Sequence, residues 1–460
     1  MGRNLNQYFE ALRGKRVLVL GLGVSNQPLA KLLLAHGARV TGCDRTERGQ
    51  LDQAVLDLER QGMALNLGPD YLEGLDADVA FRTPGLHPNH PALERLRQSG
   101  SIITSEMEAF FEVCPCPLIA ITGSDGKTTT TTLISELLKR AGKTVWVGGN
   151  IGAPLLPLAG QMQPDDVAVV ELSSFQLLDM TRSPQVAVVT NLAPNHLDVH
   201  KDMDEYIAAK ENVYLHQGAD DIVILNRDNA ITRDFRAKAK AHVKEFSRQE
   251  TPECGVYLQD GIIYRAGPEP VEILKQSEIF IPGIHNAENY MAAICAVEGL
   301  VSDDDIRAVA REFGGVEHRI ELVRVKDGVS YYNDSIASSP SRTIAGLRSF
   351  NQKIILLAGG YDKNIPYDAL GPEIVDHVKT VVLTGATAGK IRAAIEAAPG
   401  YDSDRIRILE VPDFYAAIRA AAAQAQPGDV VMMSPASASF DHFRNFMERG
   451  AAFKKTVMEL

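Results

Sequence analysis

Short apolar runs alternate with helix-like stretches along most of the chain. Near the start, an apolar run at 15–20 leads into Gly21-Leu-Gly23, a helical stretch follows, and a second apolar run closes at Asp44. This order predicts a strand, a helix and a parallel strand, which is the β-α-β unit of α/β proteins. The alternation continues until the segment 112–117, whose two prolines disfavour both helix and sheet. We therefore expect a Rossmann-like first domain over residues 1–112.

Two more stretches of the same alternation follow. Strand-like apolar runs resume, interleaved with helical patterns, at residues 118–122, 167–172, 186–191 and 222–226. Such near-continuous apolar runs are typical of a buried and largely parallel sheet, so they predict a second α/β domain over residues 113–315. Beyond Gly314-Gly315, four further runs occur at residues 353–358, 380–384, 407–411 and 430–434. They predict a third, Rossmann-like domain over residues 316–460.

Length and composition agree with a three-domain α/β protein. Hydrophobic cores stop growing at about 250 to 300 residues, so a chain of 460 residues is expected to divide into domains. The chain is 45% hydrophobic and 23% charged, and no apolar stretch approaches the roughly 18 residues of a membrane span. The first residues are polar and charged, unlike a secretion signal, and the five scattered cysteines do not resemble a disulfide framework or a zinc site. We expect a cytoplasmic protein with reduced thiols and no membrane span.

The charge balance narrows the choice of ligands. The formal net charge of -12 argues against a general nucleic-acid-binding protein, because such proteins neutralise phosphates with a basic surface. A polyanionic ligand would instead need a local site built for it. The acidic surface also favours a monomer.

The clearest local signal is Thr122-Gly-Ser-Asp-Gly-Lys-Thr-Thr129, which stands between an apolar strand and a helix expected from about 129 to 140. Glycines allow backbone N–H groups to approach phosphate oxygens, and the N-terminus of the following helix favours negative charge. Lys127 would neutralise phosphate charge, and Thr128 would bind magnesium. Ile121 stands where the strict phosphate-loop pattern has its first glycine, so a strand-glycine-helix turn without a ligand is the alternative.

The shortened form Thr-Gly-x-x-Gly-Lys-Thr resembles the loop of the Mur ligase and folylpolyglutamate synthase superfamily. Further segments match this superfamily in order and spacing over nearly the whole chain: Gly149-Asn-Ile-Gly152, Glu171-Leu-Ser-Ser-Phe-Gln176, Asn191-Leu-Ala-Pro-Asn-His-Leu-Asp198, Ala208-Ala-Lys210, His285-Asn-x-x-Asn289, His318-Arg319, Asn333-Asp-Ser335 and Ser434-Pro-Ala-Ser-Ala-Ser-Phe-Asp441. The resemblance implies three α/β domains that bind, in chain order, a UDP-sugar, ATP and an incoming amino acid. It also implies an ATP-dependent ligase of peptidoglycan synthesis, which activates a carboxylate as an acyl phosphate and then forms an amide. Within the family, the chain is most similar to the member that joins D-glutamate to UDP-N-acetylmuramoyl-L-alanine.

The resemblance assigns a site for ATP and Mg²⁺ to the second and third domains. ATP contacts are implied for Gly123, Ser124, Asp125, Gly126, Lys127, Thr128, Thr129, Asn286, Asn289, Arg319 and Asp334. Thr128 and Glu171 are implied ligands of a first Mg²⁺, and His196 and Lys210 of a second one. Because magnesium prefers oxygen ligands, the lysine would act as a carbamate formed with carbon dioxide. The implied catalytic residues are Lys127, Glu171, His196 and Lys210.

Taken singly, several of these residues have ordinary structural explanations. Glu171 would fit a strand-end carboxylate, and Arg319 a member of an ion pair. Lys210 would fit a solvated helix lysine, and His196 a capping or core histidine. Only the shared order of the motifs favours the functional interpretation.

Two further substrate sites are implied by the same resemblance. Candidates for the UDP-sugar are Gly23, Ser25, Asp44, Arg45, Gly85 and Asn150. Candidates for D-glutamate are Ser338, Lys363, Ser439 and Phe446, with Lys363 facing the side-chain carboxylate. The loops of Lys363 and Ser439 each follow an apolar run, so we expect them at the carboxyl ends of strands in one sheet, where open α/β folds bind ligands. After Asp334 the family usually has a lysine, but this chain has Ile336, which removes any contact made by that lysine.

Three other functions stay open on the sequence alone. Another amino-acid-adding ligase of the superfamily would share the phosphate loop. The segment 21–26 with Asp44 resembles a dinucleotide fingerprint, which fits an NAD-dependent oxidoreductase, although Asn26 replaces the third glycine. A non-catalytic nucleotide-binding module is the third alternative.

Overall fold

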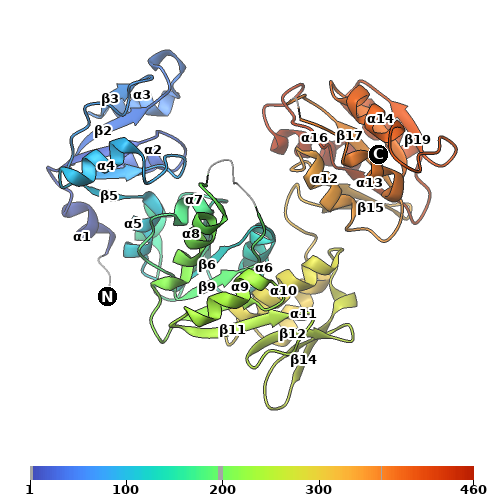
Figure 1. Cartoon of the computed structure of the whole chain (residues 1–460), viewed down its shortest axis with the longest axis horizontal. Coiled ribbons are helices and arrows are strands. Elements are labelled where there is room, and N and C mark those ends of the chain that lie inside the picture. Colours follow the sequence, from blue (N-terminus) through green and yellow to red (C-terminus); the bar gives the residue numbers. More distant parts are fainter. Residues whose placement is uncertain (1–3, 195–199, 364) are drawn as a thin grey trace. The chain divides into compact units, whose positions relative to one another are not determined.

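The computed structural model describes residues 4–194, 200–363 and 365–460 (Figure 1). The chain divides into two compact units, Met1–Gln276 with Glu288–Val309 and Ser277–Ala287 with Ala310–Leu460. Three sheets of five, nine and six strands organise these units. The predicted α/β class is confirmed, whereas the proposed boundaries after residues 112 and 315 stay predictions.

The first sheet is five-stranded and parallel, with the order β3-β2-β1-β4-β5. Its strands are β1 Arg16–Leu20, β2 Arg39–Asp44, β3 Ala64–Leu67, β4 Val79–Arg82 and β5 Ile102–Thr104. The helices of this segment are α1 Leu5–Glu10, α2 Asn26–Ala35, α3 Gln53–Arg60, α4 Pro91–Gln98 and α5 Glu106–Val113. The strand order reverses between β1 and β4, so the carboxyl ends of these strands form the crevice in which open α/β sheets bind ligands.

The middle sheet has nine strands in the order β14-β13-β12-β11-β10-β9-β6-β8-β7. They are β6 Leu118–Thr122, β7 Val145–Gly149, β8 Val167–Glu171, β9 Val186–Val189, β10 Ile222–Asn226, β11 His242–Ser247, β12 Gly255–Gln259, β13 Ile262–Arg265 and β14 Val271–Lys275. The associated helices are α6 Lys127–Arg140, α7 Ser174–Leu177, α8 Met203–Leu215, α9 Ala230–Asp234, α10 Ile284–Ala296 and α11 Asp303–Glu312. The pairing is parallel from β7 to β12 and antiparallel from β12 to β14. Every residue of β6 and β8 is buried, as expected for a parallel sheet covered on both faces.

The third sheet has six strands in the order β15-β16-β20-β17-β18-β19, with only the β15–β16 pair antiparallel. The strands are β15 Glu321–Lys326, β16 Val329–Asn333, β17 Ile354–Gly359, β18 Val378–Thr384, β19 Arg407–Glu410 and β20 Val430–Met433. The helices are α12 Pro340–Leu347, α13 Leu370–His377, α14 Ala388–Glu396, α15 Phe414–Ala423 and α16 Phe446–Glu459. Because β17 and β20 pair in parallel, the loops after them leave the same edge of the sheet, as predicted.

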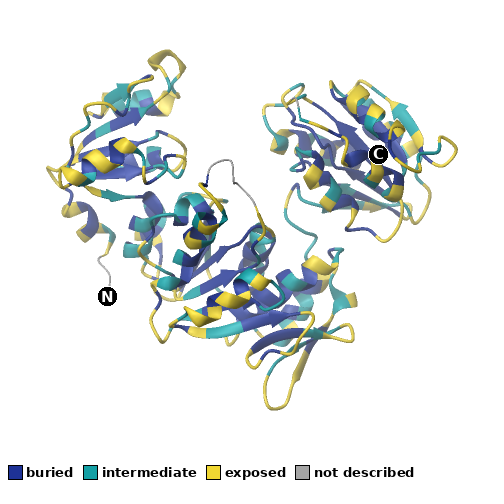
Figure 2. Ribbon diagram, in the orientation of Figure 1, coloured by how far each residue is buried: buried dark blue, intermediate teal, exposed yellow. Residues whose placement is uncertain are grey.

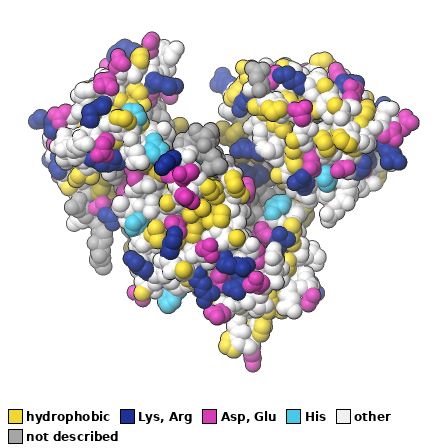
Figure 3. Space-filling model, viewed as in Figure 1, with side chains coloured by type: hydrophobic (Ala, Val, Ile, Leu, Met, Phe, Trp, Pro, Cys, Tyr) yellow, Lys and Arg dark blue, Asp and Glu magenta, His cyan; other side chains and the backbone are white. Residues whose placement is uncertain are grey.

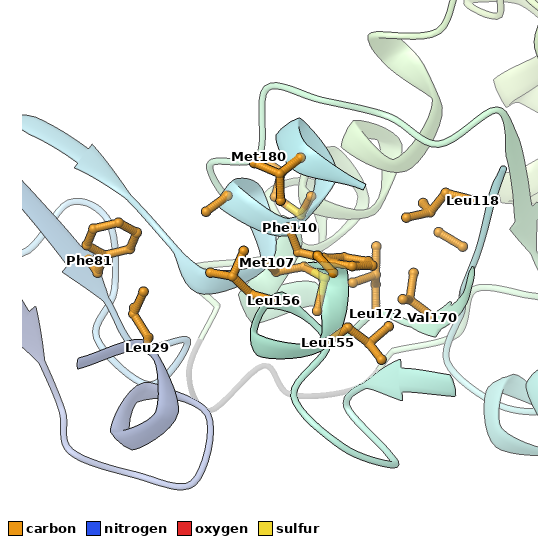
Figure 4. Close-up of a cluster of buried hydrophobic side chains, with 14 of the residues drawn as sticks. Leu29, Phe81, Met107, Phe110, Leu118, Leu155, Leu156, Val170, Leu172 and Met180 are labelled. Carbon is orange, nitrogen blue, oxygen red and sulfur yellow. The ribbon is translucent and has the colours of Figure 1, made fainter. Parts of the chain in front are cut away.

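A shared apolar core connects the first sheet to the middle sheet (Figure 4). It extends from Leu29 of α2 and Phe81 of β4 to Phe110 of α5, and continues to Leu155 and Val170. In the ribbon coloured by burial, buried residues follow the strands of each sheet (Figure 2). Burial of one such large apolar side chain contributes about 1.5 to 3 kcal/mol. Packing around α5 therefore holds the two sheets in one compact unit.

Polar residues fix the starts of the helices that carry site residues. Asp202 accepts a hydrogen bond from the backbone of Glu205 at 2.9 Å at the start of α8. Asn445 accepts from the backbone of Glu448 at 2.9 Å at the start of α16. Each cap satisfies a backbone N–H that has no partner within its helix.

The surface carries charges of both signs, and the cysteines are unpaired. Basic and acidic side chains are interspersed on the face seen in Figure 3. No helix among the described residues is long and apolar enough to cross a membrane. The five cysteines are all free thiols.

Candidate functional site

The phosphate loop connects β6 to α6 and depends on glycine at two positions. Gly123 has a φ of 146° and Gly126 a φ of 77°, a region that favours glycine. A Cβ would lie 1.9 Å from Thr190 Oγ1 at the first position and 2.4 Å from Asn289 Oδ1 at the second. Lys127 Nζ donates to two carbonyl oxygens of the loop, at 2.9 Å each. The loop thus brings a cation and the N-terminus of α6 together, which suits phosphate binding.

A hydroxyl and a carboxylate meet beside this loop. Thr128 Oγ1 donates to Glu171 Oε2 at 2.7 Å. Glu171 ends β8 and is 1% exposed, and its Oε1 accepts from Asn150 Nδ2 at 2.8 Å. Oxygen donors of these two kinds are the ligands that Mg²⁺ prefers when it also binds phosphate oxygens. The donor set therefore fits the implied first metal.

Lys210 of α8 is buried near the same loop. Its Nζ donates to Thr122 Oγ1 at 3.1 Å and lies 5.0 Å from the centroid of the Tyr206 ring. Burial lowers the pKa of Lys210 well below its ordinary value, and repulsion by Lys127 lowers it further, while Glu171 opposes the shift. The environment favours a neutral amine, which is the form that reacts with carbon dioxide.

Two residues that were not predicted hold the phosphate loop in place. The carbonyl of Asn191 accepts from the backbone of Ser124, and its Oδ1 accepts from the backbone of Asp125, both at 2.9 Å. Tyr206 Oη lies 2.9 Å from Ser124 Oγ. Asn191 belongs to a matched motif, which was the only available signal, and Tyr206 had none.

The two asparagines of α10 belong to different compact units. Asn289 Oδ1 accepts from Thr130 Oγ1 at 3.3 Å and closely approaches Gly126, so this asparagine lies at the phosphate loop. Asn286 belongs to the second unit, where its Nδ2 donates to the carbonyl of Pro282 at 2.6 Å. Asn289 therefore lies at the predicted phosphate site, and the assignment of both asparagines to ATP stays a prediction.

Arg319 stands in a strained segment of the second unit. Its neighbours His318 and Ile320 have φ values of 65° and 45°, which are costly for residues other than glycine. Arg319 Nε is buried and has no hydrogen-bond partner among the residues described. Burial raises the pKa of Asp334 to about 7, although a hydrogen bond from Ser434 and the charge of Arg319 oppose this rise. An unsatisfied buried donor in a strained loop fits an anionic ligand.

The loops that follow β17 and β20 meet as the sequence predicted. The backbone N–H of Tyr361 donates to the carbonyl of Ala438 at 2.9 Å. Lys363 Nζ lies 5.6 Å from the centroid of the Phe440 ring, next to the buried Ser439. The exposed cation of Lys363 therefore stands at the edge formed by both loops.

Arg449 was not predicted, and it joins the segments that carry the D-glutamate candidates. It is 3% exposed, and its Nη1 donates to the carbonyls of Ser437 and Ala438 at 3.0 Å. Its Nε and Nη2 donate to Ser335 Oγ and O, at 3.1 and 2.9 Å. Ser335 Oγ donates in turn to the carbonyl of Phe446 at 2.7 Å. Segments that contain Ser338, Ser439 and Phe446 are thus tied to one buried cation.

In the first sheet, Asp44 organises the glycine loop. Its two oxygens accept from the backbone of Leu22 at 2.7 Å and of Thr46 at 2.9 Å. Burial alone would raise the pKa of Asp44, but these hydrogen bonds outweigh it and lower the pKa. Asn26 is buried and donates to the carbonyl of Gly21 at 2.8 Å. Where the dinucleotide pattern has its third glycine, this chain therefore has a polar side chain that connects the start of α2 to the end of β1.

The remaining candidates for the UDP-sugar lie around the same crevice. Gly23, Ser25, Arg45 and Gly85 are exposed. A Cβ on Gly21 would lie 2.8 Å from Thr83 Cγ2, so the turn that contains Gly85 adjoins the glycine loop. Asn150 lies instead at Glu171, in the middle sheet.

The structure brings residues 123–129, Glu171, Lys210 and Asn289 into one site. His196 lies within 195–199, outside the described residues. No group of three or more His, Cys, Asp or Glu side chains that could hold a metal occurs in the described part of the chain. Magnesium usually keeps several water ligands, so oxygens of water and of the nucleotide would complete a site at Thr128 and Glu171.

Comparison with known protein families gives two matches. Residues 121–297 match the Mur ligase middle domain, and residues 318–437 match the Mur ligase, glutamate ligase domain. A UDP-N-acetylmuramoylalanine--D-glutamate ligase from Acetivibrio thermocellus is 50% identical over an alignment of 462 positions, which covers 99% of each chain. A ligase of the same name from Clostridium novyi is 46% identical over the full length of both chains.

Solved structures with a similar fold are also Mur ligases. MurF from Acinetobacter baumannii aligns with a TM-score of 0.58 and 17% identity, covering 97% of this chain and 92% of that one. UDP-N-acetylmuramate-alanine ligase MurC from Thermotoga maritima aligns with a TM-score of 0.57 and 16% identity, covering 97% and 99%. At such low identity these two structures bear on the fold alone.

Proposed function

The chain belongs to the Mur ligase family, and from that premise we infer that it adds D-glutamate to UDP-N-acetylmuramoyl-L-alanine in an ATP-dependent step of peptidoglycan synthesis. The observation that carries this inference is the 50% identity to a ligase of that name over 99% of both chains. Thr128 and the buried residues Glu171 and Lys210, which lie beside a phosphate loop, are the groups that such a ligase needs. An NAD-dependent oxidoreductase is disfavoured, because Asn26 fills the place of the third glycine.

The reaction we propose has two steps. An oxygen of the L-alanine carboxylate attacks the γ-phosphorus of ATP, ADP leaves, and an acyl phosphate forms. The amine of D-glutamate then attacks the acyl carbon, inorganic phosphate leaves, and the amide is formed. Little covalent work falls to the protein, so its residues act mainly by positioning groups and neutralising charge.

The phosphate loop would carry the phosphoryl-transfer step. Lys127 now bonds to loop carbonyls, and we propose that it turns to the phosphates when ATP binds. The N–H groups at the start of α6 would bind the same phosphates. Mg²⁺ would supply charge neutralisation at the phosphates, with Thr128 and Glu171 as its protein ligands.

Lys210 is proposed to act as a carbamate. Its burial and lowered pKa favour the neutral amine, which attacks carbon dioxide and releases a proton, leaving an oxygen ligand in place of a cation. We propose His196 as its partner at a second Mg²⁺.

The other contacts are proposed from the sequence matches together with the local geometry. Asn286, Asn289, Arg319 and Asp334 would contact the nucleotide, and the unpartnered Nε of Arg319 supports its role. Lys363, with Ser338, Ser439 and Phe446, would bind D-glutamate. The loops around Asp44 and Gly85 would bind the UDP group, with Asn150 nearer to the reacting end. We also propose that the enzyme works as a cytoplasmic monomer.

A phosphate-release assay tests this function. The chain is supplied with ATP, Mg²⁺, UDP-N-acetylmuramoyl-L-alanine and D-glutamate, and each component is omitted in turn. We expect phosphate release only in the complete mixture. Equal release with L-alanine or D-alanine in place of D-glutamate would assign the chain to another amino-acid-adding ligase.

A further inference from the structure

Arg82 ends β4 as a buried cation, 1% exposed, and bonds both to the turn that follows β4 and to the segment that follows β8. Its Nε donates to Asp179 Oδ2 at 2.8 Å, and its Nη2 bonds to the other oxygen of the same carboxylate. Nη2 also donates to the carbonyl of Phe175 at 3.1 Å. Nη1 donates to the carbonyls of Thr83 at 3.3 Å and Leu86 at 3.2 Å. One guanidinium thus joins a turn that follows β4 to a helix that follows β8.

The turn on the first side is part of the proposed UDP site. The backbone N–H of Leu86 donates to the carbonyl of Thr83 at 3.0 Å, which closes a four-residue turn around Pro84 and Gly85. Gly85 is exposed, and a Cβ there would meet no atom within 4 Å. Arg82 bonds to the carbonyls at both ends of this turn, so it fixes which way the exposed apex faces.

The helix on the second side follows the proposed metal ligand. Phe175 lies in α7, four residues after Glu171 of β8, and Asp179 lies four residues further along. Ser173 caps α7 by accepting from the backbone of Gln176 at 3.3 Å. Because this connection is short and capped, Phe175 and Asp179 are held at a fixed position relative to Glu171.

The surroundings show why this polar link matters for orientation. A cavity of about 360 Å³ adjoins the pair and is lined by Asp179, Pro88, Asn89 and Arg97 with residues of α8. Beside the pair, part of the space between the residues that follow β4 and those of α8 is therefore not filled by side chains. A buried charge costs several kcal/mol unless it is paired, and apolar residues stabilise a contact at least as well. The planar guanidinium of arginine, with its five N–H donors, instead fixes the relative orientation of the groups that it binds.

We propose that Arg82 is a positioning residue, which holds the Thr83–Leu86 turn, and with it the UDP-sugar substrate, in register with Glu171 and the phosphate loop. The inference rests on the proposed function, because it takes the turn as a UDP contact and Glu171 as a metal ligand. The uridine and the reacting carboxylate are at opposite ends of the substrate, so a small error at the turn displaces the carboxylate. A displacement of about 1 Å can slow a reaction on the order of a hundredfold.

Steady-state kinetics of Arg82→Lys and Asp179→Asn test the proposal. Arg182→Lys is the matched control, because Arg182 is half exposed and pairs with Glu112 at 2.9 Å in the same unit without bonding to the turn. We expect Arg82→Lys to raise the KM for UDP-N-acetylmuramoyl-L-alanine and lower kcat, each about tenfold, because the lysine keeps the charge but loses the fork. The KM values for ATP and D-glutamate should change less than about twofold, and Asp179→Asn should show the same pattern more weakly.

Thermal unfolding and UDP titration separate this role from a purely structural one. A lowered unfolding temperature with unchanged KM values, or an equal rise of all three KM values, would overturn the proposal. If Arg82→Lys does not fold, Asp179→Asn decides by the same criteria. Calorimetric titration with UDP alone does not depend on the reaction, and Arg82→Lys should weaken it about tenfold. An inactive wild-type enzyme would refute the proposed function, whereas equal UDP affinity in wild type and variant would refute the role of Arg82.

Discussion

Replacing Lys210 by methionine should change the stability of the first unit in a way that depends on pH. Because burial depresses the pKa of Lys210, the unfolded chain binds a proton that the folded chain rejects. Folding is therefore penalised below the unfolded pKa of about 10.4, and stability increases as pH rises toward that value. Methionine has a similar length and no proton to lose, so the variant lacks this penalty.

The size of the effect follows from two contributions. The penalty grows by about 1.4 kcal/mol for each pH unit below about 10.4 until the folded pKa is reached. Loss of the hydrogen bond to Thr122 Oγ1 costs about 0.5 to 1.5 kcal/mol, and Thr122 keeps its own bond to the carbonyl of Leu172. The gain from removing the protonation penalty equals the cost of the lost hydrogen bond at about pH 9.5. The variant should be less stable than the wild type above this pH and more stable below it.

Urea unfolding in buffers free of carbon dioxide measures this difference. Trp146 is the only tryptophan and lies in β7 of the same sheet, so its fluorescence reports this unit. Lys139→Met is the control, because Lys139 is 51% exposed in the same unit and the variant keeps Lys210, so its stability should follow the pH slope of the wild type. If the free energy of unfolding has the same pH dependence in the wild type and in Lys210→Met, the pKa of Lys210 is not depressed. The variant should also lose ligase activity, and a small added carboxylic acid should partly restore it in Lys210→Ala.

Three further variants test other parts of the site. Lys127→Ala should lower kcat on the order of a hundredfold or more, because it removes the cation that we propose to face the transferred phosphoryl group. Near-native turnover at saturating ATP would contradict the phosphate-loop assignment. Lys363→Ala should weaken D-glutamate binding by about 2 to 5 kcal/mol, seen as a raised KM for D-glutamate with little change for ATP, and an unaltered D-glutamate dependence would move the pocket elsewhere. Asp334→Asn should stabilise the second unit at pH 8 but not at pH 4, because the raised pKa of about 7 means that stability is lost as pH rises from about 3.8 through 7. That interval corresponds to about 4 kcal/mol at most, and urea unfolding that gives equal stability differences at both pH values would exclude the raised pKa.

Most of the strands that the sequence predicted are largely buried, although β19, predicted at 407–411, is partly exposed. The apolar runs 118–122 and 222–226 coincide with β6 and β10. A short continuous apolar run is typical of a strand that is covered on both faces of a parallel sheet. The strands that were not named are β3 to β5, β7, β11 to β14, and the antiparallel pair β15 and β16, and all of them except the buried β4 have partly exposed positions. Their residues mix polar and apolar side chains, so the pattern did not distinguish them from loops.

The site was predicted where its chemistry is local in sequence. Residues 122–129 carry their own signal, since loop, cation and helix start lie within eight positions. Tyr206 and Arg449 were missed, because they act on partners that are 82 and 114 positions away, Ser124 and Ser335. Their importance arises only when the sheets bring distant segments together.

Transfer of a labelled oxygen tests the central claim most directly. UDP-N-acetylmuramoyl-L-alanine is prepared with heavy oxygen in the L-alanine carboxylate and incubated with the enzyme, ATP, Mg²⁺ and D-glutamate. Formation of an acyl phosphate requires that one labelled oxygen leaves with each inorganic phosphate, while the other stays in the new amide. We expect this labelled phosphate in amounts equal to the amide product, and none of either when D-glutamate is replaced by L-glutamate. Label in AMP, or amide formation with unlabelled phosphate, would contradict the proposed mechanism.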